Sequence, residues 1–472
     1  MTSTPIIHLT QKSRRLSADL ETPISLFLSV AGQNTPGILL ESAEVDGQWG
    51  RYSVIACDFL LTASCRNGIL ELTIDDERLA PLKALNGLPF PDGVRQLMRS
   101  LTLTCDDAKQ APITRALYGY FGYETAALLQ PKLTGTIKVS DAESCLVLPG
   151  TVLVFDHRYN KLTQISLNEH RDIPFRNISQ TSEPSIGDIT RTPNRDEYIK
   201  GVEKIRTLLH DGEAIQVVLS TQASADFEGD PFTLYRRMRS LNPSPYMFFM
   251  RLPRICLLGS SPELLVRCTA GKLQLSPIAG TRPRGDDDLA DAKFAADLLQ
   301  DPKEKAEHIM LVDLGRNDLG RIAKPGSVKV ERLMEVERFS HVMHMTSRVT
   351  AQLQDNLDAM DIISAAFPAG TVSGAPKVRA MEIIAETETL PRGPYAGCIG
   401  WLGLDKDTVH LDAGITIRSL WVRGESTKQR AYWQSGAGLV YDSNPAAEWQ
   451  ECMNKAKIID VILTGEDHVP TH

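Results

Sequence analysis

The sequence predicts an α+β (mixed α/β) fold, in which large, mostly antiparallel β-sheets are covered by helices on the outside. Two observations support this prediction. Residues 60–75 and 151–158 are short runs of β-forming side chains, typical of an antiparallel sheet. After residue 193, strand-like segments such as 215–223 alternate with helix-like ones such as 194–213, for which Asn194 is a suitable N-cap.

A polar stretch at residues 168–194 separates two regions of the chain. It contains three prolines and has neither helical nor strand periodicity. We therefore expect an N-terminal region over residues 1–190 and a second region over residues 191–472. Further along, the charged segment 286–303 predicts a helix whose acidic first turn suits the helix dipole.

The composition excludes several classes of protein. A net charge of −8 over 472 residues argues against nucleic-acid binding, because phosphate contacts need a basic face. No stretch approaches the roughly 18 apolar residues of a membrane-spanning helix, and the N-terminus has no signal-like apolar run. The eight cysteines are scattered and form no CxxC pair. The sequence therefore predicts a cytoplasmic protein with reduced thiols.

Two pairs of acidic residues suggest a metal site. Glu304 and Glu307 begin one probable helix, and Glu448 and Glu451 begin another. Residues three apart share a helix face, so each pair points in one direction, and Lys455 lies on the same face as Glu451. Four converging carboxylates repel one another unless a cation lies among them, and oxygen ligands suit Mg²⁺. Because such pairs are common on helix surfaces, two unrelated solvated faces remain the alternative.

Three glycine-containing segments predict anion binding. Residues 368–387 contain a turn before a helix N-terminus, where exposed amides attract anions. Residues 432–449 contain glycines that let backbone N–H groups approach a ligand. The stretch 275–285, LSPIAGTRPRG, adds two arginines but places Ala279 in its middle. An arginine in GITIRS, Arg418, could pair with a carboxylate, and His344 suits proton transfer at neutral pH. Each segment alone could equally be an ordinary turn.

Together these segments resemble the chorismate-utilising enzymes. The resemblance covers roughly residues 194–460 and rests on the following motifs, in order: SPIAGTRPRG, EHIMLVDLGRNDLGR, FSHVMHMTS, GTVSGAPKVRAMEII, AGCIGW, ITIRS and QSGAGLVYDSNPAAEWQECMNKA. It implies two large β-sheets packed as a sandwich, with helices outside and a central active-site cleft.

The resemblance also implies roles for individual residues. The metal region, for Mg²⁺ bound directly or through water, would comprise Glu304, Glu307, Glu448 and Glu451. Chorismate would be bound by Gly280, Thr371, Tyr395, Arg418, Gly436, Ala437, Gly438 and Lys455. The catalytic residues would be His344, near the enolpyruvyl group, with Thr281 and Glu263 close to the ring.

Two positions distinguish reactions within this family. Members that add water to the ring resemble one another in carrying a lysine on a strand where this chain has Gln216, and an amide cannot act as a general base. Members that form 4-amino-4-deoxychorismate carry a lysine where this chain has Ala279, which cannot form a covalent intermediate. The expected reaction is direct addition of ammonia at ring carbon C2, followed by loss of pyruvate to give anthranilate.

Segments of both regions resemble the tryptophan feedback pocket of anthranilate-forming members. The segments are LLES at residues 39–42 and NPSPYMFF at residues 242–249. An acidic residue and a hydroxyl could hold the ammonium of L-tryptophan, and apolar side chains could enclose its indole. The residues implied are Leu40, Glu41, Ser42, Asn242, Pro243, Tyr246 and Met247.

The source of ammonia is expected on a separate chain. None of the cysteines lies in the G-x-C-x-G-x-Q elbow of a glutaminase, and Cys398 in AGCIGW lacks that frame. We therefore expect a glutamine amidotransferase partner in a two-plus-two heterotetramer. Three alternatives stay open from the sequence: an aminodeoxychorismate synthase, a 2-amino-2-deoxyisochorismate synthase that stops before pyruvate is lost, and a non-enzymatic sensor of tryptophan or chorismate.

Overall fold

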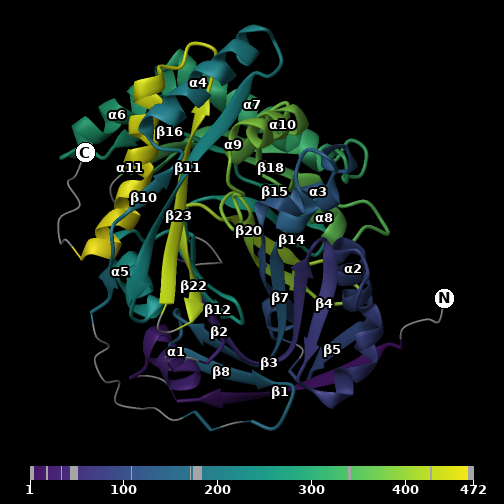
Figure 1. The fold of residues 1–472 in the computed structure, drawn as a ribbon. Helices are drawn as coiled ribbons and strands as arrows, with labels where there is room; N and C mark the ends of the chain where they lie inside the picture. The colour runs from purple at the N-terminus through teal and green to yellow at the C-terminus, as the bar shows by residue number, and fades with distance from the viewer. Residues whose placement is uncertain are drawn as a thin grey trace.

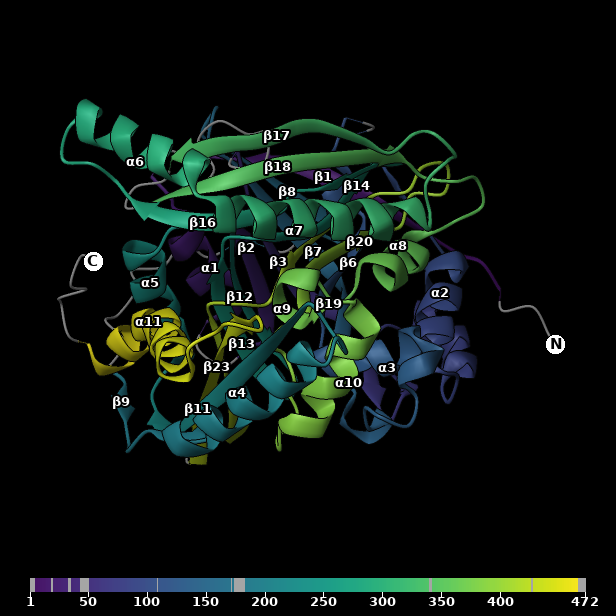
Figure 2. The ribbon, with the colours of Figure 1, turned by 90° about the horizontal axis from the view of Figure 1, so that it is seen from above.

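A computed structural model describes residues 5–17, 20–32, 35–42, 51–107, 109–170, 172–173, 183–338, 342–425 and 428–465. It confirms the predicted mixed α/β fold with mostly antiparallel strands. Among the described residues, the hydrogen-bonded pairs connect 23 strands, and the pair formed by β1 (Ile7–Leu16) and β5 (Leu101–Cys105) is the single parallel one. Figures 1 and 2 show the helices on the outside of this β-structure.

The strand pairings form two arms that branch from β3 (Tyr52–Arg66). The first arm begins with β7 on one edge of β3, and the second arm begins with β2 on the other edge. In order of pairing, the first arm contains β7 (Ser144–Asp156), β6 (Ala116–Phe121), β20 (Cys398–Gly403), β21 (Leu411–Ile415), β14 (Leu264–Thr269), β15 (Lys272–Leu275) and β18 (Val342–Gln352), and β18 also pairs with β16 (Ile278–Pro283) and β17 (Lys329–Arg338).

The second arm brings a distant part of the chain to the opposite side. In order of pairing it contains β2 (Gly37–Glu41), β12 (Tyr246–Leu252), β13 (Ile255–Ser261), β22 (Ser419–Glu425), β23 (Lys428–Leu439) and β11 (Gln216–Glu228), and β11 also pairs with β9 (Ser185–Ile186), β10 (Thr190–Thr192) and β19 (Gly374–Ala375). Outside the arms, β4 (Ile69–Ile74) pairs with β3, and β8 (Lys161–Ser166) pairs with β7 and β1. Both arms therefore combine strands from before and after the polar stretch at 168–194.

Among the connections that cross from one arm to the other, two are short. The chain passes from β13 to β14 through Glu263, and from β21 to β22 through Arg418. The two crossings are hydrogen-bonded side by side: the amide of Ser260 donates to the carbonyl of Arg418 at 3.1 Å, and the amide of Ile415 donates to the carbonyl of Glu263 at 3.0 Å. This joint fixes both charged side chains where the arms meet.

Helices cover the outer faces of the arms. They are α1 (Pro23–Ala31), α2 (Phe90–Ser100), α3 (Ala126–Leu129), α4 (Arg195–His210), α5 (Pro231–Leu241), α6 (Asp288–Gln300), α7 (Pro302–Gly320), α8 (Ala359–Ala366), α9 (Gly370–Ser373), α10 (Lys377–Thr387) and α11 (Pro445–Thr464). In Figure 2, α7 lies along β16 and β18, with which it is in contact. On the other arm, α4 contacts β11 and β23, and α11 contacts β23.

Local sequence signals explain several of these elements. The predicted N-cap of α4 is confirmed, because the side chain of Asn194 accepts from the amides of Asp196 and Glu197 and the Glu197 carboxylate accepts from the Asn194 amide. The acidic segment forms α6 with Asp287 as its N-cap. The polar stretch at 168–194, by contrast, contains the two short strands β9 and β10, which add to the edge of β11.

Two large apolar cores support the arms, and each contains residues from both of them. The larger core lies along the first arm and includes Leu117, Val147 and Leu273, which are fully buried. The second lies between the second arm and α1, α5 and α11, and includes Phe249 and Trp433. Burial of such side chains stabilises a fold by about 1.5–3 kcal/mol each. Because both cores contain residues from both arms, they also pack the arms against each other.

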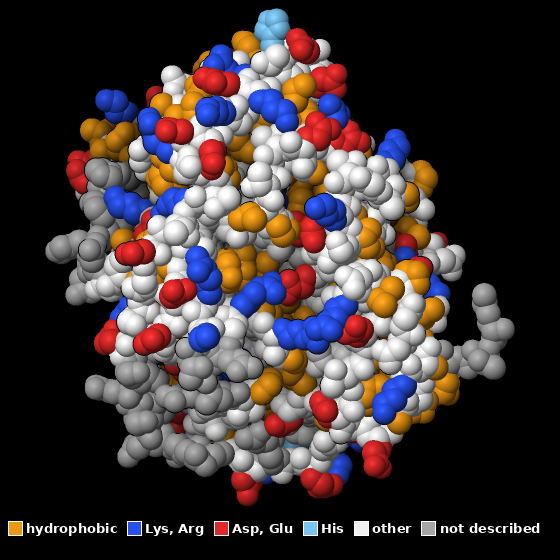
Figure 3. Space-filling view, in the orientation of Figure 1, with side chains coloured by type: hydrophobic (Ala, Val, Ile, Leu, Met, Phe, Trp, Pro, Cys, Tyr) orange, Lys and Arg blue, Asp and Glu red, His pale blue; other side chains and the backbone are white. Residues whose placement is uncertain are grey.

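The surface fits the predicted charge distribution. On the face shown in Figure 3, acidic and basic side chains are interspersed, and no broad field of one sign covers it. Within the described part of the chain, no helix is long and apolar enough to span a bilayer.

Candidate active site at the meeting of the two arms

A cavity of about 220 Å³ lies where the far ends of the two arms face one another. The first arm contributes β16 and β18, the second contributes β11 and β23, and α7, α9 and α11 close the remaining sides. Most of the predicted site residues line it: Glu263, Gly280, Thr281, Glu307, His344, Thr371, Tyr395, Arg418, Gly436, Gly438 and Lys455, together with Gln216 and Ala279.

Glycines on β23 form one wall of this cavity from bare backbone. A Cβ atom added to Gly436 would lie 2.8 Å from the hydroxyl of Tyr395, and one added to Gly438 would lie 2.6 Å from Nε2 of Gln216. These glycines lie within a paired strand and not in a loop, which corrects the sequence-based expectation. Ala437 points to the other face of the strand, where it is buried against α4, α10 and α11, so it does not line the cavity.

Glu263 is a buried carboxyl beside two cations. Burial raises its pKa to about 7, against the opposing influence of the Thr371 hydroxyl and of the charges on Lys455 and Arg418. Burial also lowers the pKa of the Arg418 guanidinium, which Glu263 partly offsets. A carboxyl with a pKa near neutrality can give up a proton during a reaction, while the neighbouring cations suit an anionic ligand.

The ring of His344 is oriented by the backbone of β16. Its Nδ1 lies 3.0 Å from the carbonyl oxygen of Gly280 and 3.1 Å from Oγ1 of Thr281. A carbonyl oxygen can only accept, so Nδ1 carries the hydrogen and Nε2 carries the lone pair. Burial lowers the pKa of His344, and the neutral ring is therefore available as a base.

Gly280 is required by the shape of the site. It lies at an irregularity in the pairing of β16 with β18, and its φ of +68° is one that residues with a side chain rarely adopt. A Cβ atom there would lie 2.6 Å from Leu298 and 3.0 Å from an oxygen of Glu304. The absence of a side chain lets α7 bring its carboxylates against the cavity.

The four predicted metal-binding glutamates lie on two helices that face each other, α7 and α11. Burial raises the pKa of Glu307, and the charges of Glu304 and Glu451 raise it further. Burial likewise raises the pKa of Glu448, with a contribution from Glu451. Glu307 lines the cavity itself. Among the described residues, no three His, Cys, Asp or Glu side chains lie close enough together to enclose a metal ion unaided.

Two cations already neutralise part of this acidic region. Lys455 Nζ lies 2.7 Å from Glu451 and donates to the carbonyl of Gly436 at 3.0 Å, so it links the acidic helix to the glycine wall. On the other side, Arg282 Nη1 lies 3.3 Å from Glu304. The all-oxygen donor set and the mutual repulsion of the carboxylates fit a hard divalent cation that keeps water ligands and shares a carboxylate of its substrate.

The arginines of LSPIAGTRPRG bind the protein's own carboxylates. Arg282 lies 2.7 Å from Asp297 and 2.9 Å from Asp301, and Arg284 lies 2.6 Å from Asp291. The expectation that this stretch holds an external anion is therefore wrong for its arginines. They fasten β16 to α6 and to the start of α7.

A second cavity, of about 250 Å³, lies near the base of the second arm. Of the residues predicted to bind tryptophan, Leu40, Glu41, Ser42, Tyr246 and Met247 line it, whereas Asn242 and Pro243 do not. The carboxylate of Glu41 is already held by the Tyr235 hydroxyl at 2.6 Å and by Arg239 at 2.9 Å. The Glu41 carboxylate therefore forms a structural ion pair with Arg239 at the wall of this cavity.

Sequence reasoning missed two residues that shape this second cavity, Asp412 and Arg267. The Tyr246 hydroxyl donates to Asp412 at 2.7 Å, while Arg267 donates to Asp412 at 3.0 Å and to the Tyr246 oxygen at 3.0 Å. Asp412 and Arg267 lie on β21 and β14, in segments whose alternating patterns indicate only strands. Their role appears only when the pairing of these strands is known.

Comparison with known proteins agrees with this geometry. A family model described as chorismate binding enzyme matches residues 79–460. Anthranilate synthase component 1 of Aquifex aeolicus is 37% identical, with 94% of this chain and 92% of the relative covered, and that of Neisseria meningitidis serogroup B is 38% identical, with 94% and 93% covered.

Solved structures show the same fold. Anthranilate synthase component I from Streptococcus pneumoniae is 33% identical and superposes with a TM-score of 0.71, covering 94% of this chain and 98% of that one. The menaquinone-specific isochorismate synthase from Escherichia coli superposes with a TM-score of 0.73 at 18% identity, covering 98% of this chain and 96% of that one, and shows a shared fold alone. Since the family model spans most of the sequence, this chain belongs to the chorismate-binding enzymes.

Proposed function

We propose that the chain is the chorismate-binding component of an anthranilate synthase, which converts chorismate and ammonia to anthranilate, pyruvate and water. The observation that carries the proposal is the cavity at the meeting of the arms. It combines a neutral histidine base, a carboxyl with a pKa near 7 and two cations, while Gln216 and Ala279 occupy the positions of the lysines that direct related reactions. The relatives named above support it.

Substrate binding follows from the charges of the cavity. Chorismate carries two carboxylates, and the cavity is lined by two cations, Arg418 and Lys455, that can pair with them. The bare backbone at Gly436 and Gly438 lets the ligand lie directly against β23. The amide oxygen of Gln216 is buried and has no hydrogen-bond partner among the described residues, so it is available to accept from ammonia.

Amination is the first chemical step. The lone pair of ammonia forms a bond to C2, the ring double bonds shift, and the bond from C4 to its hydroxyl breaks. Glu263 donates the proton with which the hydroxyl leaves as water, and the new ammonium group on C2 then returns one proton to Glu263 to give the amine. This role uses the raised pKa of Glu263, because the carboxyl must be protonated when the reaction begins.

Elimination of pyruvate is the second step. Nε2 of His344 takes the proton from C2, the electrons of that C–H bond enter the ring, and the bond from C3 to the enolpyruvyl oxygen breaks. The ring becomes aromatic, and the released enolate is protonated to pyruvate. Thr281, within 3.1 Å of His344, helps to hold the imidazole in place.

Mg²⁺ would be held in the acidic region between α7 and α11. We assign Glu304, Glu307, Glu448 and Glu451 to it, directly or through water, with the ring carboxylate of chorismate completing the site. When bound, the ion neutralises that carboxylate and polarises the conjugated ring. The protein's part is to orient the carboxylates from two facing helices.

Regulation and partnership complete the proposal. We assign the 250 Å³ cavity to L-tryptophan as a feedback inhibitor, with residues 1–190 contributing the LLES wall and residues 191–472 carrying the catalytic site. We assign ammonia supply to a glutamine amidotransferase subunit in a heterotetramer. All eight cysteines are free, which suits the reducing cytoplasm.

Product identification tests the proposed function. Purified protein with chorismate, MgCl₂ and ammonium chloride at raised pH is expected to form a product with the mass and fluorescence of anthranilate. Accumulation of 4-amino-4-deoxychorismate or of 2-amino-2-deoxyisochorismate would contradict the proposed function. The absence of any product would also contradict it. A reaction with EDTA in place of MgCl₂ tests the metal and is expected to form no anthranilate.

A further inference from the structure

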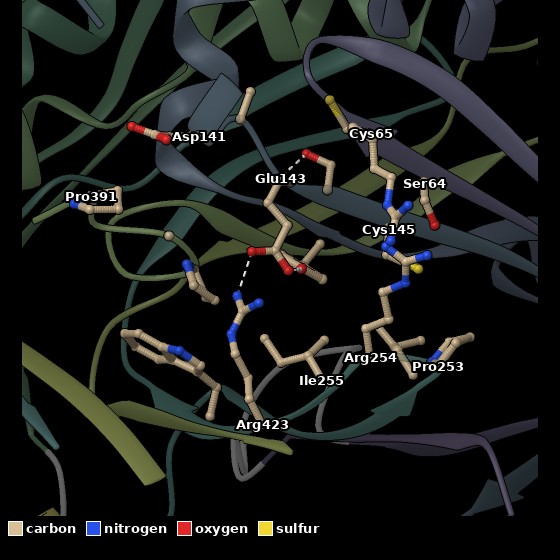
Figure 4. Close-up of a pocket in the computed structure, with 18 of the residues that line it drawn as sticks. Ser64, Cys65, Asp141, Glu143, Cys145, Pro253, Arg254, Ile255, Pro391 and Arg423 are labelled. Carbon is tan, nitrogen blue, oxygen red and sulfur yellow. Dashed lines mark hydrogen bonds and ion pairs between the residues drawn. The ribbon is translucent and has the colours of Figure 1, made fainter. Parts of the chain in front are cut away.

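An open cavity of about 810 Å³ lies beside the candidate active site and has no part in the chemistry proposed so far. Figure 4 shows it spanned by an ion pair, in which Arg423 reaches Glu143, with Pro391 on one side and Arg254 and Cys65 on the other. Its wall is formed by polar and charged side chains from both arms and by the loop before Tyr395. A small polar molecule can enter it from solvent.

One face of the β11–β23 ladder runs from this open cavity into the active-site cavity. Side chains alternate along a strand, so Gln216, Val218, Ser220 and Gln222 of β11 share a face. The pairing register places Gln222 opposite Gln434 and Ser220 opposite Gly436. Gln222 lines the open cavity, whereas Gln434, Gly436 and Gly438 line the active-site cavity.

Side chains with amide and hydroxyl groups lie between the two cavities along this face. Gln222 Nε2 lies 3.4 Å from Oε1 of Gln434 and 3.4 Å from the carbonyl of Pro391. Gln434 Nε2 in turn donates to the Ser220 hydroxyl at 2.7 Å. Both hydrogen bonds of Gln222 are long, and its side chain is only half-buried. This side chain can therefore rotate away at a small cost in free energy.

The deeper wall of the partition is electrically balanced. Glu388 accepts from the Ser220 hydroxyl at 2.6 Å and forms a 2.7 Å ion pair with Arg392, which is almost fully buried. Arg392 also donates to the carbonyl of Val218 at 2.7 Å. A passage lined by amides, a hydroxyl and a neutralised pair gives donors and acceptors to a small neutral molecule and no attraction to a dianion.

We propose that the open cavity is the entrance for ammonia and that Gln222 and Gln434 form the gate through which ammonia reaches the active site. The proposal rests on the function proposed above and adds the route. Chorismate enters elsewhere, and the glutaminase subunit delivers ammonia at the mouth that holds Arg254 and Arg423. Amides suit the gate because they exchange hydrogen bonds with ammonia and do not protonate it.

Steady-state kinetics of gate variants test this proposal. Gln222→Trp fills the gate, and Gln222→Leu seals it with an apolar side chain of similar size. With saturating chorismate and Mg²⁺, we expect Gln222→Trp to raise the KM for ammonia about ten-fold and Gln222→Leu about three-fold, while the KM for chorismate stays within about two-fold. Arg430→Trp, on the neighbouring strand β23 and outside both cavities, is the matched control and should change neither value.

The outcomes separate the route from the reaction. An unchanged KM for ammonia in folded Gln222→Trp would contradict the proposal that Gln222 forms the gate. If the tryptophan variant does not fold, an unchanged KM in Gln222→Leu would contradict it. A rise in the KM for chorismate alone would instead make this cavity the chorismate entrance and would also overturn it. Failure of the wild-type protein to form anthranilate from ammonium would refute the proposed function, independently of any gate variant.

A second measurement uses the complex with the glutaminase subunit. The wild-type complex should form one anthranilate for each glutamine hydrolysed. Because ammonia that cannot pass the gate escapes into solvent, Gln222→Trp should lower this ratio by about half or more. A ratio that stays at one in this variant would overturn the route.

Discussion

At the scale of single residues, the environment of a side chain decides its chemistry. Glu263 and the acidic residues of α7 are all carboxylic acids, yet burial at the joint between the arms raises the pKa of Glu263 to about 7. The same burial keeps His344 neutral. The site therefore contains a proton donor and a proton acceptor that are both poised at neutral pH.

The pH dependence of turnover follows from Glu263. Its folded pKa is raised, so the protonated donor is present below about pH 7 and is lost as the pH rises through that value. With the concentration of free NH₃ held constant, kcat/KM for chorismate should be flat between the lowered pKa of His344 and pH 7, and it should fall above pH 7.

Glu263→Gln should remove that inflection and lower the rate by about 10²- to 10⁴-fold, the range typical of a lost general acid. Glu337→Gln, a substitution of an exposed glutamate on β17, provides the comparison and should keep the wild-type profile. If Glu263→Gln keeps an inflection near pH 7, the proton donor is another group.

Several of these residues were predictable from the sequence, and others were not. His344, Arg418 and the glycines of β23 belong to motifs that resemble a known family, so their convergence was expected. The raised pKa of Glu263 depends on the crossing of two connections that are about 150 residues apart in sequence. Likewise, Arg282 and Arg284 resemble anion ligands until their partners on α6 and α7 are known.

At the scale of elements, the site depends on α7 and α11 facing each other. Each helix projects two carboxylates from its first turns, and the electrostatic influence of Glu451 on Glu307 connects the two helices. Glu307→Gln or Glu451→Gln should therefore largely abolish Mg²⁺-dependent turnover. Activity within a few-fold of wild type, measured across a Mg²⁺ titration, would exclude direct ligation by that residue.

The close approach of β16 to α7 is a second element-scale feature. Gly280→Ala adds a Cβ atom against Leu298 and Glu304 and places a side chain at a φ of +68°. We expect it to lower the free energy of unfolding by about 1–3 kcal/mol, the usual cost of such strain. Gly271→Ala, at a φ of +79° but with no neighbour within 4 Å, isolates the backbone contribution.

Denaturant unfolding of the two glycine variants separates crowding from strain. The difference between them measures the crowding at Gly280, and equal destabilisation would show that the contacts with Leu298 of α6 and Glu304 of α7 contribute nothing. Sequence alone predicts α7 and β16 as a helix and a strand, but the distance between them depends on packing that no local pattern encodes.

At the scale of the whole molecule, the two arms connect the cavity proposed to bind tryptophan with the proposed active site. The joint at Glu263 and Arg418 borders the active site, while Tyr246 of β12 lies in the second cavity and contacts β21 through Asp412. A ligand that shifts the arms relative to each other changes both cavities. If tryptophan favours one arrangement of the arms, it weakens the binding of chorismate, and bound chorismate weakens the binding of tryptophan by the same factor.

The tryptophan site is tested by filling the second cavity. Ser42→Phe places an aromatic ring in a space of about 250 Å³ and should relieve inhibition by tryptophan while kcat stays near wild type. Pro243→Ala serves as a control, because this exposed residue does not line the cavity and its loss should leave inhibition intact. An unchanged inhibition curve for Ser42→Phe would place the inhibitor elsewhere.

The overall architecture was predictable as a class but not as a topology. Strand patterns and the family resemblance predict mostly antiparallel sheets with helices outside, which the structure confirms. The pairing of β6 with β20, almost 300 residues apart, and of β2 with β12 could not be read from local periodicity. Such long-range pairings are selected by the packing of the complete chain.

The central claim is that one cavity performs both amination and loss of pyruvate. The most direct test is the molar ratio of pyruvate to anthranilate, measured continuously while the purified protein turns over chorismate with ammonium and Mg²⁺. The account predicts a ratio of one from the first turnover. Pyruvate-free accumulation of an aminated intermediate, or pyruvate without anthranilate, would contradict it.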